Sequence, residues 1–155
     1  MSNSFWDVTT FDKHLRENAN TPFAWGAHDC CLSAANAILS HTGVDLASDF
    51  RGKYHDEASG LAIMKSVTGS ESVADAVAYC AKKHGLIEYE HPLSAKRGDL
   101  VLVKNGDTVI CGVIHLNGKH VISVGPKGLV RLPITAVVRA WAVWPTLKSV
   151  AIEVA

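Results

Sequence analysis

The hydrophobic period of the chain changes near Pro92, and this change limits the folds that the chain can adopt. Before this proline, apolar residues recur three and four positions apart, which is typical of amphipathic helices. After it, short apolar runs alternate with turns that contain glycine, which is typical of an antiparallel sheet. The sequence therefore predicts an α+β fold in which N-terminal helices pack on an antiparallel β-sheet.

The same patterns place the individual elements. The expected helices lie at residues 8–18, 29–41, 57–67 and 71–84. The expected strands lie at residues 100–103, 109–116, 120–124, 129–132 and 139–144. The first two strands are apolar on both faces, so we expect helices to cover one face of the sheet, and loops or a partner to cover the other.

Length and charge narrow the class of protein further. A chain of 155 residues, 48% of them hydrophobic, can bury one core, so we predict a single domain over residues 1–155 with its core at about 22–145. Lys plus Arg and Asp plus Glu each number 15 without blocks of like charge. This balance argues against nucleic acid and membrane surfaces as partners.

Neither a membrane anchor nor a secretion signal is recognisable. No apolar run has the length of a membrane-spanning helix, and residues 1–12 lack the basic and apolar regions of a signal peptide. We therefore expect the protein to be made and first folded in a cytoplasm. The four cysteines, at positions 30, 31, 80 and 111, show no spacing typical of a disulfide framework or a zinc site, so we predict no metal and no cofactor.

The stretch from Trp25 to Leu32 contains the best candidate for chemistry. Asp29 is a candidate N-cap, which places Cys30 at the first position of a helix. Unpaired backbone N–H groups and the helix dipole favour a thiolate at that position, so Cys30 is the candidate nucleophile. Cys31 falls in the apolar sector of the same helix, so we expect it to be a core residue.

Three landmarks in this order resemble those of the NlpC-type cell-wall cysteine peptidases, which have a papain-like fold. They are the run from His28 to Cys30 before a helix of small residues, the run from Arg97 to Val103, and the run from Cys111 to Ile114 followed by Asn117-Gly118. The runs 22–26 and 139–141 make the chain more similar still to small NlpC-like proteins encoded in tail gene clusters of phages and prophages. The resemblance covers about residues 22–125.

The resemblance implies a catalytic histidine at the start of one strand and a polar residue that orients it on the next. In this chain those registers hold Ile110 and Ile122. His120 and His28 are the substitute bases to consider. His41 lies eleven residues beyond Cys30, about 16 Å along a helix, and is too far.

His115 alternates with Ile110 along its strand, so we expect it on the opposite face.

Without a base, a thiol near its reference pKa of about 8.5 is only a few per cent ionised at neutral pH. We therefore expect a degenerate peptidase domain rather than a competent enzyme.

The leading hypothesis for function follows from the resemblance. It is a structural component of a phage tail, in the tail tip or in tail assembly, located in the virion after assembly in the host cytoplasm, with other tail proteins as partners. Aromatic and polar residues near the former cleft are the candidate contacts: Trp25, His28, Asp29, Tyr54 and Trp141. The alternatives are an active cysteine peptidase or amidase that cleaves peptidoglycan peptides during entry, and a non-catalytic peptidoglycan-binding module.

Overall fold

The computed structural model describes residues 8–144, 146 and 147, and in these residues it contains four α-helices and a six-stranded antiparallel sheet. The helices are α1 (Val8–Glu17), α2 (Cys30–Thr42), α3 (Glu57–Thr68) and α4 (Val73–Lys83). The strands are β1 (Ile87–Glu88), β2 (Leu100–Asn105), β3 (Thr108–Ile114), β4 (His120–Gly125), β5 (Gly128–Pro133) and β6 (Val137–Ala142). Two 3₁₀ helices, η2 (Pro92–Ser94) and η3 (Ile134–Ala136), precede β2 and β6. The predicted α+β class is confirmed, while the two-residue strand β1 was not predicted.

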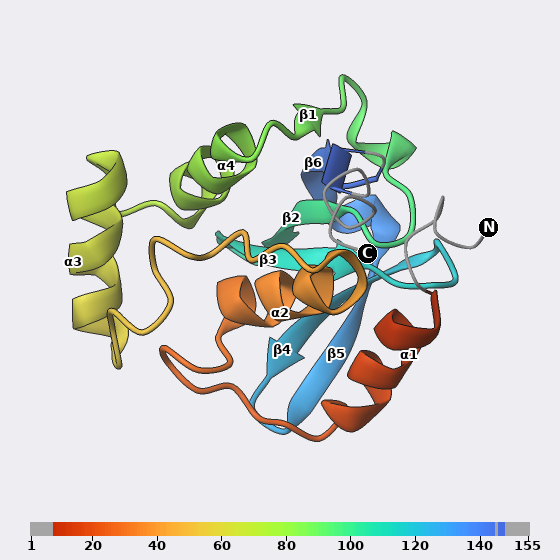
Figure 1. Ribbon diagram of the computed structural model, residues 1–155, viewed down its shortest axis with the longest axis horizontal. Helices are drawn as coiled ribbons and strands as arrows, with labels where there is room; N and C mark the ends of the chain where they lie inside the picture. The colour runs from red at the N-terminus through yellow and green to blue at the C-terminus, as the bar shows by residue number, and fades with distance from the viewer. Residues whose placement is uncertain (1–7, 145, 148–155) are drawn as a thin grey trace.

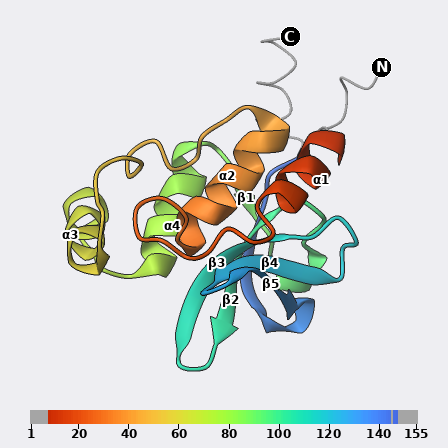
Figure 2. The ribbon, with the colours of Figure 1, turned by 90° about the horizontal axis from the view of Figure 1, so that it is seen from below.

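The strands follow the order β1-β6-β2-β3-β4-β5 across the sheet, and each is antiparallel to its neighbours. Figure 1 and Figure 2 show α1, α2 and α4 on one side of this sheet, with α3 at the outer end of the helical layer. Between the helices and the sheet lies the larger core, which includes Ile38, Leu102 and Val113. A smaller core on the far face includes Val101 and Ile114.

Both faces of β2 and β3 are therefore buried, as their apolar composition predicts. On the far face, the covering residues come from the loops and 3₁₀ helices around η2 and η3, among them Ala95, Ile134 and Ala136. The helical face of the core also extends beyond the predicted boundary of about residue 22. Phe11 and Leu15 of α1 are buried in it, because they lie four residues apart on one helical face and pack toward α2.

The central helix α2 has well-defined ends. Asp29 has an extended backbone and its side chain accepts a hydrogen bond from the Leu32 N–H, which makes it the N-cap. Gly43 ends the helix in the left-handed conformation with φ of 79°, which glycine adopts without strain, and its N–H donates to the Leu39 carbonyl. Helix α2 therefore begins at Cys30, directly after its N-cap, and this confirms the predicted cap position of Asp29.

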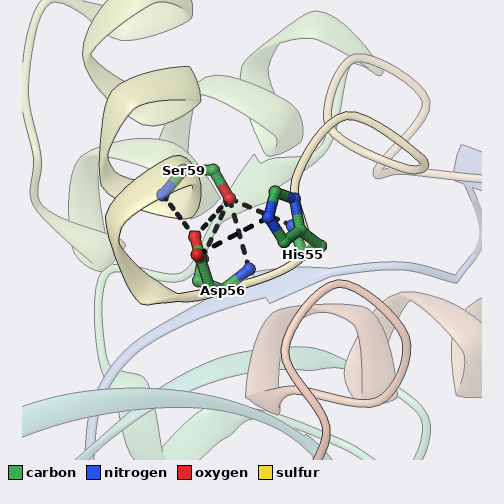
Figure 3. Close-up of polar contacts among 3 residues, drawn as sticks. All are labelled: His55, Asp56 and Ser59. Atoms are coloured by element: carbon green, nitrogen blue, oxygen red, sulfur yellow. Dashed lines mark hydrogen bonds and ion pairs between the residues drawn. The ribbon is translucent and has the colours of Figure 1, made fainter.

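Helix α3 begins with a reciprocal cap (Figure 3). The Asp56 carboxylate accepts the Ser59 N–H at 2.8 Å, and the Ser59 hydroxyl accepts the Asp56 N–H at 3.2 Å and the His55 N–H at 3.0 Å. In α3 only Gly60 is fully buried, with the Tyr54 ring against it. The local cap therefore stabilises a helix that contributes little to the central core.

The Gly98-Asp99 landmark lies at the start of β2, beside the end of the neighbouring strand β6. The Asp99 side chain is buried, and its Oδ2 atom accepts from the Tyr89 hydroxyl at 2.6 Å and from the Lys96 N–H at 2.8 Å. Its Oδ1 atom accepts from the Val143 N–H at 3.0 Å. Burial raises the pKa of Asp99, and the hydrogen bonds with Tyr89, Lys96 and Val143 oppose this effect. One carboxyl group thus joins the turn before β2 to the end of β6.

Replacing Asp99 should destabilise the fold strongly. In Asp99→Ala, the hydroxyl of Tyr89 and two backbone N–H groups lose their acceptor, so we expect a loss of about 3 kcal/mol in the free energy of unfolding. Chemical denaturation measures this quantity. The control is Asp107→Ala, in the exposed β2–β3 turn, for which we expect a change of about 0.5 kcal/mol or less. Equal effects of the two substitutions would contradict the assigned role.

Candidate functional site

The loop before α2 is held by the Asp29 carboxylate, which is 3% exposed. Its Oδ1 atom accepts from the Leu32 N–H at 2.9 Å, and its Oδ2 atom accepts from the Gly26 N–H at 3.0 Å and from the Tyr54 hydroxyl. Burial, followed by the hydrogen bond to Asp29, raises the pKa of Tyr54. Asp29 thus joins three separate segments of the chain and acts as a structural acceptor.

Gly26 is required for this arrangement. Its φ is +77°, and a Cβ atom built there would lie 2.1 Å from the Tyr54 carbonyl oxygen. Only glycine permits both the left-handed backbone and this close approach. The Trp25-Gly26 sequence is therefore explained by the contact between the loop before α2 and the segment before α3.

Cys30 lies at the first residue of α2, where a thiolate was expected, but its surroundings oppose ionisation. A hydrogen bond with Cys31 raises the pKa of Cys30 most, burial raises it further, and contact with the backbone of Cys111 only partly offsets these effects. The pKa of Cys31 is also raised, chiefly by a hydrogen bond with the Cys111 side chain. Burial and the neighbouring thiols therefore favour the neutral form of Cys30 over the thiolate.

Strand β3 presents the third thiol to this site. We expected Ile110 on the face toward α2, and the structure contradicts this expectation. Val109, Cys111 and Val113 face the helices, whereas Ile110 packs against the core on the far side of the sheet. The residue of β3 that approaches Cys30 is Cys111, which the sequence analysis did not assign to the site.

His120, the preferred substitute base, lies far from the thiol. It begins β4, where its carbonyl accepts from the His115 N–H at 2.8 Å and its Nδ1 atom lies 2.9 Å from the Asn117 amide nitrogen. His115 is four residues along the chain from Cys111, which corresponds to about 13 Å at strand rise. Because Cys111 is next to Cys30, neither His115 nor His120 reaches the thiol.

His28, the other candidate base, is near Cys30 in sequence but makes no hydrogen bond with it. The His28 side chain is 5% exposed, and neither ring nitrogen has a hydrogen-bond partner in the described part of the chain. His41 lies at the C-terminal end of α2, where its ring centroid is 4.9 Å from that of Phe11. The structure therefore brings no histidine of residues 8–144, 146 and 147 to the Cys30 thiol as a hydrogen-bonded base.

The aromatic residues that were expected near the cleft lie in different environments. Trp25 is 42% exposed and meets Phe23 edge to face, with the ring centroids 5.0 Å apart. Tyr54 is half-buried behind Asp29. Trp141 is 3% exposed in the core, with the Arg139 guanidinium 4.9 Å from its ring centroid, so its ring has almost no surface to offer a partner.

An apolar cavity of about 70 Å³ adjoins the thiols and lies among α2, α3, α4 and the sheet. Its lining includes Cys31, Cys80, Cys111, Tyr54 and Met64. Burial raises the pKa of Cys80 to about 11, so this thiol is also protonated at neutral pH. The cavity contains soft, apolar groups and no charged side chain among its lining residues.

Two searches of the described residues gave negative results. No group of three or more His, Cys, Asp or Glu residues within them could hold a metal ion. Among the helices that the structure describes, none has both the length and the apolar character needed to span a bilayer.

Comparison with known proteins identifies a family. Residues 4–143 match the family described as a domain of unknown function, DUF6950. Because the match covers most of the chain, the chain belongs to this family. No curated protein and no solved structure matches the chain.

The thiols should be unreactive in the folded protein. Since the pKa of Cys30 is raised, we expect iodoacetamide at pH 7.5 to alkylate Cys30 at least about tenfold more slowly in the folded chain than in denaturant. Mass spectrometry of tryptic peptides gives the rate at each cysteine. Rapid alkylation of folded Cys30, with a half-maximal rate below about pH 7, would be incompatible with this environment.

Removing the Tyr54 hydroxyl should test the Asp29 anchor. In Tyr54→Phe, the buried carboxylate loses one of its donors, so we expect the free energy of unfolding to fall by about 1–2 kcal/mol. The matched control is Tyr79→Phe, whose hydroxyl donates to the partly exposed Asp49 at 2.7 Å and should matter by about 0.5 kcal/mol or less. A larger loss in the control would refute the special role of Asp29.

Proposed function

We propose that this member of the DUF6950 family is a non-catalytic structural component of a phage tail, in the tail tip or in tail assembly, built on a papain-like NlpC-type fold. The observation that carries the non-catalytic part is the partly buried Cys30 thiol, whose pKa is raised by its neighbours and which has no histidine hydrogen-bonded to it in the described residues. The assignment to a phage tail rests on the resemblance in sequence, from the loop before α2 to the run 139–141.

The arrangement of elements supports the papain-like part of the proposal. Helix α2 begins at Cys30 and packs across an antiparallel sheet, with β3 directly beneath its first turn. A papain-like fold places a cysteine at this point, at the start of a helix that packs on the sheet. In this chain three free thiols meet at this point. Cys31 interacts with Cys30 and with Cys111.

The chemistry of the junction disfavours peptide hydrolysis. Nucleophilic attack requires a thiolate, and departure of the amine requires a proton donor, a role typically worth about a hundred- to ten-thousand-fold in rate. A hydrogen bond with Cys31 lowers the pKa of the Cys111 thiol, but burial and the nearby thiols raise it overall, so Cys111 is neutral at pH 7 and is a poor substitute for histidine in either role. A tail component needs neither step, and this is why we prefer the structural function to the peptidase.

A peptidoglycan-binding module is the second non-catalytic function to consider, because one observation favours it. The edge-to-face pair of Phe23 and Trp25 places an exposed aromatic face beside the loop before α2. Aromatic faces stack on apolar faces of ligands at low entropic cost. Direct titration with soluble muropeptides separates this function from protein–protein contact within a tail.

Complementation of a particle-forming phage tests the proposal. In a phage whose copy of the gene is deleted, both the wild-type gene and Cys30→Ala should restore infectious particles to within about threefold, with the protein present in purified tails. The peptidase alternative predicts a loss of about a hundredfold or more for Cys30→Ala, together with muropeptide cleavage by the wild-type protein alone. Absence of the protein from tails, or muropeptide cleavage that depends on Cys30, would overturn the proposal.

A further inference from the structure

A buried histidine near the first helix remains unexplained by the fold. His28 is 5% exposed, yet neither of its ring nitrogens has a hydrogen-bond partner in the described residues. Buried polar atoms in native proteins are almost always paired, because an unpaired one loses its water without compensation.

Two further histidines line the same region, where α1 packs on α2. His14 of α1 is half-buried, and burial followed by the charge of His28 lowers its pKa. His41 of α2 is 6% exposed, and burial followed by the charge of His14 lowers its pKa to about 4. His14 thus interacts with a histidine on each side, and the Phe11 ring, 4.9 Å from that of His41, joins the two helices.

The charged groups around these rings do little to stabilise added protons. On α1, Glu17 attracts a proton to His14 but is mostly exposed and lies 3.9 Å from Lys13. Helix α2 has no Asp, Glu, Lys or Arg in its sequence, and Asp29 before it already has its donors. From the sheet side, the backbone of Gly98 is hydrogen-bonded to His41 and raises its pKa only in part.

We propose that His14 and His41, which lie between α1 and α2 near the buried ring of His28, make the docking of α1 sensitive to acid, so that protonation of these two histidines releases α1 from α2 while the sheet and the remaining helices stay folded. Release separates Phe11 and Leu15 from the α2 face that they cover, and exposes an apolar surface on each side. This inference does not depend on the proposed function.

The direction in which α1 docking depends on pH follows from proton linkage. In the docked state His41 holds a proton only below about pH 4, whereas in the released state its pKa returns toward 6.5. The released state therefore binds more protons between these values, and α1 docking is fully favoured above about pH 6.5 and weakens as the pH falls. His41 alone increases the ratio of released to docked protein about tenfold per pH unit in this window, and His14 acts in the same direction.

NMR spectroscopy of the full chain between pH 7.5 and 4.0 tests the proposal. Contacts between the rings of Phe11 and His41 should disappear, and the α1 amides should shift, with a midpoint between about pH 4 and 6.5. The Trp141 indole signal, which reports on the core beneath α2, should persist through this change. Simultaneous loss of the α1 and Trp141 signals would mean acid unfolding of the whole chain and would overturn the proposal.

Variants assign the effect to the histidines. The double substitution His14→Gln and His41→Phe should lower the midpoint by about one pH unit or more, since it removes both sites. His55→Gln is the matched control, because the His55 side chain is 85% exposed beside α3 and should leave the midpoint unchanged. If the double variant does not fold at pH 7.5, the single variant His14→Gln gives the result, with a smaller decrease. The proposal would be overturned if His55→Gln lowered the midpoint as much as the histidine variants do. It would also be overturned if His14→Gln left the midpoint unchanged.

Discussion

Two buried carboxylates connect the segments on which the rest of the structure depends. Asp29 and Asp99 each accept hydrogen bonds from one tyrosine hydroxyl and two backbone N–H groups. Asp29 joins the start of α2 to the segment before α3, and Asp99 joins the turn before β2 to the end of β6. Because each carboxylate pairs with three donors, Asp29 fixes the junction between the loop and α2, and Asp99 fixes the place where the start of β2 meets the end of β6.

The environment of the thiols is a consequence of that junction. The Asp29 cap places Cys30 in the first turn of α2, and the first turn lies against β3 at Cys111. A thiol held there loses contact with water on several sides and gains other thiols as neighbours, so the neutral form is favoured over the thiolate.

The sequence predicted most of the fold and less of the candidate site. The helical period of three to four residues and the turns after Pro92 located all four helices and five strands, because each element carries a local signal. The orientation of β3 carries no such signal. Its residues are apolar on both faces, so alternation alone could not show that Cys111 rather than Ile110 faces α2. Contacts such as Asp99 with Tyr89 and Val143 depend on tertiary structure and were likewise not predictable from spacing.

The residues on which the resemblance to cell-wall peptidases rests have structural explanations in this chain. Gly26 is required by its close approach to Tyr54, Asp29 by three hydrogen-bond donors, and Asp99 by the ends of β2 and β6 that it joins. A chain that lost catalysis would keep these residues, since replacing them destabilises the fold whatever the fate of the thiol. Their presence therefore carries no information about activity. The residue of β3 that approaches Cys30 is Cys111, a buried thiol that is neutral at pH 7 because its pKa is raised overall, and this environment is what the landmarks alone do not reveal.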